Sequence, residues 1–236
     1  MLDWIFPNTC HLCGEVAGAT LCPDCLHALA RVPKPVCMYC GAPVAGNQQD
    51  PYHCEACRGK PRPFSFARSA LYEDDTTLDL VHALKYHKHT HLARALAPVL
   101  AELWEDSHLL ADVADWALVP VPVTKRKLFS RGYNQAEELA EELVKLRPMP
   151  IIQPLRRVNT GVRSQTNLSA TERMKNAYRA YSLLPRYADG ARSLPRNVLI
   201  LDDVYTTGAT ARACAHALRQ AKGVKNIGII TLLRVR

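Results

Sequence analysis

The chain has 236 residues, of which 48% are hydrophobic, and its formal net charge is +8. This length predicts one domain of ordinary size plus a small module, with enough apolar residues for a buried core. No apolar run approaches the roughly 20 residues of a membrane-spanning helix, which argues against a membrane span. The first seven residues lack the basic and long apolar regions of a signal peptide, so we expect a cytoplasmic protein.

The first 57 residues contain four C-x-x-C pairs, which hold eight of the nine cysteines. Two residues between thiols form a tight turn that lets both sulfur atoms face one metal, and two such pairs complete a tetrahedral Zn²⁺ site. The sequence therefore predicts two structural zinc sites, with the ligands Cys10, Cys13, Cys22, Cys25, Cys37, Cys40, Cys54 and Cys57. Because so short a segment with few large apolar side chains would not fold without metal, we predict a double zinc-ribbon module at residues 1–62.

Other readings of these pairs are possible. A disulfide framework needs an oxidising compartment, which the expected location disfavours. A redox role suits a single C-x-x-C pair better than four of them. The pairs can be used in order, the first two for one metal and the last two for the other, or they can interleave; we prefer the sequential use. The ninth cysteine, Cys214, is expected to be a buried small residue of a helix.

From residue 63 onward the pattern changes to alternating strands and helices. We expect strands at 64–72, 116–120, 198–201 and 227–233, and helices at 76–84, 92–104, 134–146 and 209–221. Pro98 predicts a break or a first-turn position in the second of these helices. This alternation favours a parallel α/β sheet, so residues 63–236 are predicted to form one α/β domain. Ligands of such sheets gather at the carboxyl ends of the strands.

The most informative segment is V-L-I-L-D-D-V-Y-T-T-G-A-T at residues 198–210. Its apolar run predicts a buried strand, which is followed by two carboxylates, a Thr/Gly loop and a helix. Free backbone N–H groups at a helix start can hold a phosphate. Asp202 and Asp203 can accept hydrogen bonds from vicinal sugar hydroxyls or help to place Mg²⁺. The whole ordered set predicts a ribose 5-phosphate site, whereas a helix cap alone needs only one such side chain.

The net positive charge is concentrated between residues 125 and 179, where twelve Lys and Arg residues stand against five acidic ones. A positive field of this kind favours phosphate-rich ligands, either nucleotides or nucleic acids. The polar loop at 157–168 is a candidate flap over a charged substrate. The candidate contacts for DNA or phosphate are Lys125, Arg126, Arg131, Arg157 and Arg163.

Segment 198–210 resembles the phosphoribosyl-pyrophosphate (PRPP) signature of the type I phosphoribosyltransferases, in which an apolar strand precedes two acids and a TTG-type loop. By this likeness Asp202 and Asp203 contact ribose hydroxyls, while the 5′-phosphate is held by Thr206, Thr207, Gly208, Ala209 and Thr210. Lys85 and Tyr86, at the end of a predicted helix, are candidates to meet the pyrophosphate. Mg²⁺ is expected to accompany PRPP on that pyrophosphate.

The whole chain resembles the ComF (ComFC, GntX-type) competence family. The resemblance rests on the four C-x-x-C pairs, L-K-Y at 84–86, P-V-P at 120–122, R-G-Y-N-Q at 131–135 and the segment at 198–210. It implies a zinc module followed by a type I phosphoribosyltransferase-like domain. It also implies a role in DNA uptake during natural transformation, or in the use of external DNA.

Two functions stay open on this basis. In the favoured one, the domain binds PRPP or a related ribose phosphate, while the basic segment and the zinc ribbons engage single-stranded DNA or proteins of the DNA-uptake machinery. In the alternative, the protein is an active phosphoribosyltransferase that moves phosphoribosyl from PRPP to an unidentified acceptor, through loss of pyrophosphate from an electrophilic C1. Residues 64–84 contain no set of aromatic and amide side chains that would identify a purine or pyrimidine acceptor. The basic segment contains only a few aromatic residues on which bases could stack.

Overall fold

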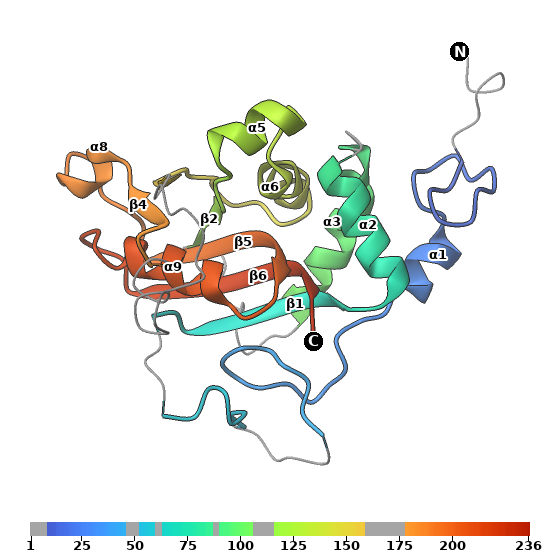
Figure 1. The fold of residues 1–236 in the computed structure, drawn as a ribbon, viewed down its shortest axis with the longest axis horizontal. Helices are drawn as coiled ribbons and strands as arrows, with labels where there is room; N and C mark the ends of the chain where they lie inside the picture. Colours follow the sequence, from blue (N-terminus) through green and yellow to red (C-terminus); the bar gives the residue numbers. More distant parts are fainter. Residues whose placement is uncertain (1–8, 46–51, 60–62, 87–89, 106–115, 159–177) are drawn as a thin grey trace, which may run out of the picture.

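The structure of the chain is a computed structural model that describes residues 9–45, 52–59, 63–86, 90–105, 116–158 and 178–236. A parallel sheet of four strands forms its centre, in the order β1-β6-β5-β2 (Figure 1). The strands are β1 (Phe66–Tyr72), β2 (Trp116–Pro120), β5 (Asn197–Tyr205) and β6 (Asn226–Arg234). The predicted α/β class is confirmed, and each of the four expected strands lies in this sheet.

Helices pack on both faces of the sheet. One face is covered by α2 (Asp75–Tyr86), α3 (His91–Ala101) and α6 (Gln135–Leu146). The other is covered by α9 (Ala209–Leu218) and by an antiparallel pair of short strands, β3 (Leu155–Arg157) and β4 (Tyr181–Leu183). The shorter helices are α1 (Pro23–Ala28), α5 (Lys125–Arg131) and α8 (Pro185–Ala188). In the ranges described, no helix has the length and apolar character needed to cross a membrane.

Residues 198–201 of strand β5 are all apolar because both faces of the strand are covered there. Alternate residues of a strand point to opposite faces of the sheet. Val198 and Ile200 belong to the core on the α9 side, whereas Leu199 and Leu201 belong to the core formed with α3 and α6. All four side chains are fully buried, which is the pattern of a parallel strand between two helical layers.

The helix predicted at 92–104 differs from the observed one. α3 continues through Pro98 without the predicted break, and it gives way to a 3₁₀ helix, η1 (Glu102–Glu105). The apolar face of α3 explains this, since Leu92, Leu96 and Leu100 are fully buried against the sheet and neighbouring helices. Their burial outweighs the backbone hydrogen bond that a proline removes from a helix interior.

The two cysteine clusters lie against different parts of the α/β domain (Figure 1). Cys10 and Leu21, of the first cluster (residues 10–25), pack in the core that contains α2 and α3. The second cluster (residues 37–57) lies beside the edge strand β1, where the Ala67 N–H donates to the Tyr39 carbonyl oxygen at 2.7 Å. Tyr39 and Cys37 pack in the other core, with α9.

Candidate ligand site and zinc centres

The 206–210 loop connects the carboxyl end of β5 to α9. Gly208 is the N-cap residue of α9 and has a left-handed backbone with φ 71°, a conformation that other residues rarely adopt. No side chain caps this helix start, so backbone N–H groups of its first turn are available to an acceptor from outside the chain. A bound anion would also meet the positive end of the helix dipole.

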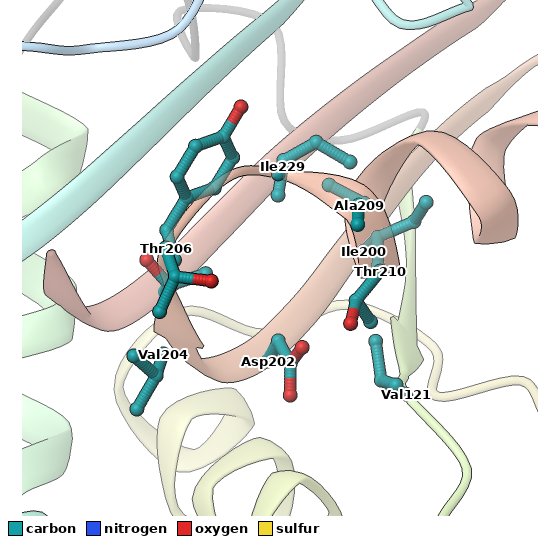
Figure 2. A pocket seen from close by; sticks show the side chains of 12 residues that line it. Val121, Ile200, Asp202, Val204, Thr206, Ala209, Thr210 and Ile229 are labelled. Atoms are coloured by element: carbon teal, nitrogen blue, oxygen red, sulfur yellow. The ribbon is translucent and has the colours of Figure 1, made fainter. Parts of the chain in front are cut away.

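Two adjoining hollows open where β5 ends. The smaller one is formed by the loop residues Thr206, Gly208 and Ala209 together with Asp202 and Thr210 (Figure 2). The larger one is a cleft of about 230 Å³ with walls from α2, α5, α6 and β3. Asp202 and Thr210 line both hollows, so a ligand that occupies the cleft can extend to the loop.

Most of the predicted ligand residues meet at this place. The cleft is lined by Lys85, Tyr86, Arg131, Arg157, Asp202, Asp203 and Thr210. These side chains come from four separate helices and strands, α2, α5, β3 and β5, and from the first turn of α9. The fold therefore brings acids, cations and hydroxyls from distant parts of the sequence to one edge of the sheet.

The remaining predicted residues lie elsewhere. Thr207 lines neither hollow, and its carbonyl oxygen accepts a hydrogen bond from Nη2 of Arg212 at 2.8 Å. Lys125 and Arg126 are exposed on α5, outside the cleft. Arg163, with most of the predicted flap, lies outside the described residues.

An ion pair joins α2 to the end of β5. The Nζ atom of Lys85 lies 3.1 Å from Oδ2 of Asp203, and the two side chains are only 24% and 15% exposed. The backbone N–H of Asp203 donates to Oδ1 of Asp202 at 3.0 Å. The two carboxylates are therefore held in fixed positions before any ligand arrives, which reduces the entropy cost of binding.

The surroundings of Asp202, which is partly buried where the two hollows meet, disfavour the charged form of its side chain. Burial raises the pKa of Asp202 well above its usual value, the neighbouring Asp203 carboxylate raises it further, and Lys85 offsets only part of this. Because this pKa is higher in the folded chain than in the unfolded chain, the folded state binds the proton more tightly. The free energy of unfolding therefore decreases as the pH rises from the unfolded pKa through the folded one.

Replacement of this carboxylate should consequently stabilise the protein. We expect Asp202→Asn to raise the melting temperature by about 2–4 °C at pH 8, since the amide has a similar shape and cannot ionise. At pH 4 the gain should be smaller, because the raised pKa keeps more of the native Asp202 protonated there. Thermal unfolding at the two pH values measures both effects, and a gain of equal size at each pH would contradict this account.

Four polar residues of the cleft were not among the predicted contacts: Lys127, Asn134, Gln135 and Tyr181. The Tyr181 hydroxyl accepts a hydrogen bond from Nη1 of Arg157 at 2.7 Å. Gln135 is only 2% exposed, and its Nε2 has no hydrogen-bond partner among the described residues. A buried amide without a partner is costly, so Gln135 is a candidate donor to a ligand. The R-G-Y-N-Q motif was the sequence signal that pointed to this segment.

Each cysteine cluster has the geometry of a tetrahedral metal site. The four Sγ atoms of each cluster lie within 4.8 Å of one another, and the pairs are used in sequence, as preferred from the spacing. The Sγ atoms of Cys13 and Cys22 are 3.9 Å apart, and those of Cys40 and Cys54 are 3.7 Å apart. A Zn–S bond of about 2.3 Å gives a tetrahedron edge of about 3.8 Å. A disulfide would require about 2.05 Å, so the residues fit zinc and not a disulfide framework.

Backbone N–H groups donate hydrogen bonds to one sulfur atom in each cluster and favour its thiolate form. The N–H of Cys22 donates to Sγ of Cys10, and the N–H of Cys54 donates to Sγ of Cys37, both at 3.4 Å. Burial by itself would raise the pKa of Cys10 and Cys37, but these and other backbone hydrogen bonds lower it to about 6 in both. Thiolates are the form that binds Zn²⁺. Both clusters are therefore suited to structural zinc.

Comparison with known proteins defines the class. Residues 1–62 match the double zinc ribbon domain family, and the parallel sheet that follows is consistent with a phosphoribosyltransferase-like fold. DNA utilization protein YhgH of Salmonella typhi is 31% identical over 219 residues, which cover 90% of this chain and 91% of the relative. Competence protein F of Haemophilus influenzae is 28% identical over 223 residues, 93% of each chain. Competence protein ComFC of Bacillus subtilis is 26% identical over 223 residues, 91% of this chain and 84% of the relative. The chain belongs to the ComF family.

Proposed function

We propose that this protein binds PRPP, or a related ribose phosphate, at the carboxyl end of β5, and that it acts in DNA uptake during natural transformation or in the use of external DNA. The second part rests on the names of the relatives, which are a competence protein and a DNA utilization protein. The first part rests on one observation: the uncapped start of α9 adjoins a cleft that contains two fixed carboxylates.

Each part of a ribose phosphate has a counterpart in this site. Asp202 and Asp203 accept hydrogen bonds from the ribose hydroxyls. Backbone N–H groups of the 206–210 loop and the first turn of α9 hold the 5′-phosphate. Gln135 has an amide donor without a partner in the described chain, which a ligand oxygen would satisfy.

The pyrophosphate of PRPP matches the positive charge of the cleft. Lys127, Arg131 and Arg157 all line it, and the guanidinium of Arg131 lies 4.7 Å from the ring centroid of Tyr86, which holds it in place. Arginine is suited to phosphate oxygens because its donors form a planar fork. Mg²⁺ would bind through the pyrophosphate oxygens, as is usual for this ion.

Titration calorimetry of the intact protein with PRPP and Mg²⁺ tests the proposal. Saturable binding of one PRPP per chain is expected, with weaker binding of ribose 5-phosphate because it lacks the pyrophosphate. The assignment would be overturned if neither PRPP nor ribose 5-phosphate gave a saturable heat of binding. Incubation with PRPP, Mg²⁺ and a panel of bases then decides between binding and transfer, since base-dependent release of pyrophosphate would establish the active phosphoribosyltransferase.

Single-stranded DNA is the proposed second ligand, and helix α5 is its proposed contact. Phe129 of this helix is 94% exposed and Leu128 is 44% exposed, and Lys125 and Arg126 are exposed on the same helix. Proteins that bind single strands combine cations for the phosphates with aromatic side chains on which bases stack. An almost fully exposed phenylalanine among cations has this composition.

The double variant Arg126→Ala/Arg131→Ala should weaken binding of a single-stranded oligonucleotide and its dependence on salt. Each phosphate contact contributes about 0.7 to the slope of log K against log salt, so the slope should become shallower by about 1.4. Fluorescence anisotropy at several salt concentrations measures it. Lys222→Ala/Lys225→Ala, which removes two exposed charges before β6, is the matched control. Equal effects in both variants, or no binding by the intact protein at low salt, would overturn this contact.

A further inference from the structure

Two buried arginines connect the second cysteine cluster to the sheet. Nη1 of Arg234, on β6, donates to the Cys40 carbonyl oxygen at 2.7 Å, and Nη2 of Arg234 lies 4.0 Å from the Cys40 Sγ atom. Nη1 of Arg68, on β1, donates to the Met38 carbonyl oxygen at 3.2 Å. Arg234 is only 9% exposed and Arg68 only 5%. The turn that presents Cys37 and Cys40 is therefore held by cations of the α/β domain.

Arg234 has a second partner, Tyr205, which is the last residue of β5 before the 206–210 loop. The two residues are register partners in adjacent parallel strands. The guanidinium of Arg234 lies 5.0 Å from the centroid of the Tyr205 ring, which is 4% exposed. A cation at this distance over a buried aromatic face is attracted to it. Arg234 thus contacts the zinc-binding turn on one side and the base of the loop on the other.

The Tyr205 side chain in turn supports the loop itself. The Tyr205 hydroxyl lies so close to Gly208 that a Cβ atom on residue 208 would clash with it. The positive φ of Gly208 and this close approach both require glycine. Movement of the Tyr205 ring would therefore remove the support on which the N-cap of α9 rests.

The charges of these groups explain why the metal matters. Four thiolates and one Zn²⁺ carry a net charge of about −2. Arg234 forms no ion pair with a carboxylate anywhere in the described ranges, and a buried charge needs an opposite charge nearby. The zinc-thiolate group is the negative partner that this guanidinium has. Loss of the metal would release the four sulfur atoms from one another and loosen the turn that presents the Cys40 carbonyl oxygen, and with it the position of Arg234.

The first cluster lies against a different part of the α/β domain. Its residues Cys10 and Leu21 pack in the core with α2 and α3, whereas Tyr205 and Cys40 belong to the other core. Hydrogen bonds to its sulfur atoms come from within the cluster: the N–H of Cys22 donates to Sγ of Cys10, and the N–H of Cys25 donates to Sγ of Cys22.

We propose that zinc in the second ribbon positions the 206–210 loop through Arg234 and Tyr205, so that order in the loop depends on the second zinc and not on the first. Arg234 is a positioning residue in this scheme and does not touch the ligand. The consequence for ligand affinity rests on the proposed ribose-phosphate function. The consequence for the loop does not, because it concerns the free protein.

Hydrogen–deuterium exchange of the unliganded protein tests the loop directly. Exchange in the loop is followed at the Arg212 N–H, which donates to the Gly208 carbonyl oxygen at 2.9 Å. Arg234→Met should accelerate this exchange by about tenfold while zinc content stays at two per chain. Arg236→Met is the matched control, because Arg236 also lies over a tyrosine, at 5.4 Å from the Tyr72 ring, but touches neither Cys40 nor the loop. It should leave the exchange unchanged.

Removing one metal at a time distinguishes the role of the second ribbon from that of the first. Cys57→Ser, in the second ribbon, should accelerate exchange in the loop, whereas Cys13→Ser, in the first, should not; each variant should retain one zinc. If Arg234→Met also loses zinc, the test uses Arg234→Lys instead. This variant keeps the positive charge but lacks the planar group that stacks on Tyr205. Unchanged loop exchange in Cys57→Ser, or equal acceleration in Cys13→Ser, would overturn the proposal. These outcomes do not depend on PRPP, so failure to bind PRPP would refute the proposed function alone.

Discussion

The double variant Asp202→Asn/Asp203→Asn is expected to lose PRPP affinity by a factor of about 10²–10⁴. Each carboxylate provides charge-assisted hydrogen bonds to the ribose, worth about 1.5–3 kcal/mol per residue, and each 1.4 kcal/mol corresponds to a tenfold change in Kd. The chain should remain folded, because burial and mutual repulsion raise the pKa of Asp202 and make its charge unfavourable to the fold. Titration calorimetry and thermal unfolding measure the two properties.

The matched control removes two negative charges elsewhere. Asp79 and Glu141 are exposed on α2 and α6 and line neither hollow. Asp79→Asn/Glu141→Gln should therefore leave the Kd for PRPP within about a factor of two, since exposed charges at a distance are screened by salt. A Kd that is the same in both double variants would show that the ligand does not lie against Asp202 and Asp203.

The end of β5 shows how much of this site the sequence could predict. The run at 198–201 identifies a buried parallel strand because it is apolar at every position, and the structure covers this strand on both faces. The loop and helix that follow are local features, so their order in the sequence is their order in space. The acids, the loop and the start of α9 could therefore be placed from residues 198–210 alone.

Contacts between distant segments could not be derived in the same way. The pairing of Lys85 with Asp203 depends on where α2 ends relative to β5, whereas local pattern could identify only a candidate lysine at the end of a helix. The stacking of Arg234 on Tyr205 depends on the register of β6 against β5. Lys127 could not be assigned to the cleft because the short helix α5 was not predicted. Strand register and short connecting helices are set by tertiary packing, which local pattern does not encode.

Loss of zinc should have the largest effect on stability, because the short cysteine-rich segments contain few large apolar side chains of their own. Structural zinc contributes about 10–16 kcal/mol in isolated zinc-finger peptides. Here the ribbons also pack on the α/β domain, through Cys10 and Leu21 in one core and Tyr39 in the other. The cost of losing one metal should therefore be a part of that figure, and it should fall mainly on the ribbon that loses its ligand.

Cys13→Ser is accordingly expected to reduce zinc content from two atoms per chain to one and to lower the free energy of unfolding by about 3 kcal/mol or more. Cys214→Ala is the control, because Cys214 is fully buried in α9, burial raises its pKa well above the usual value, and it lies outside both clusters. It should keep both metals and cost about 1 kcal/mol, the loss of one small buried group. Metal analysis and denaturant unfolding measure these quantities. Two zinc atoms in Cys13→Ser would mean that this thiolate is not a ligand, and that the tetrahedral spacing of the first cluster has another cause.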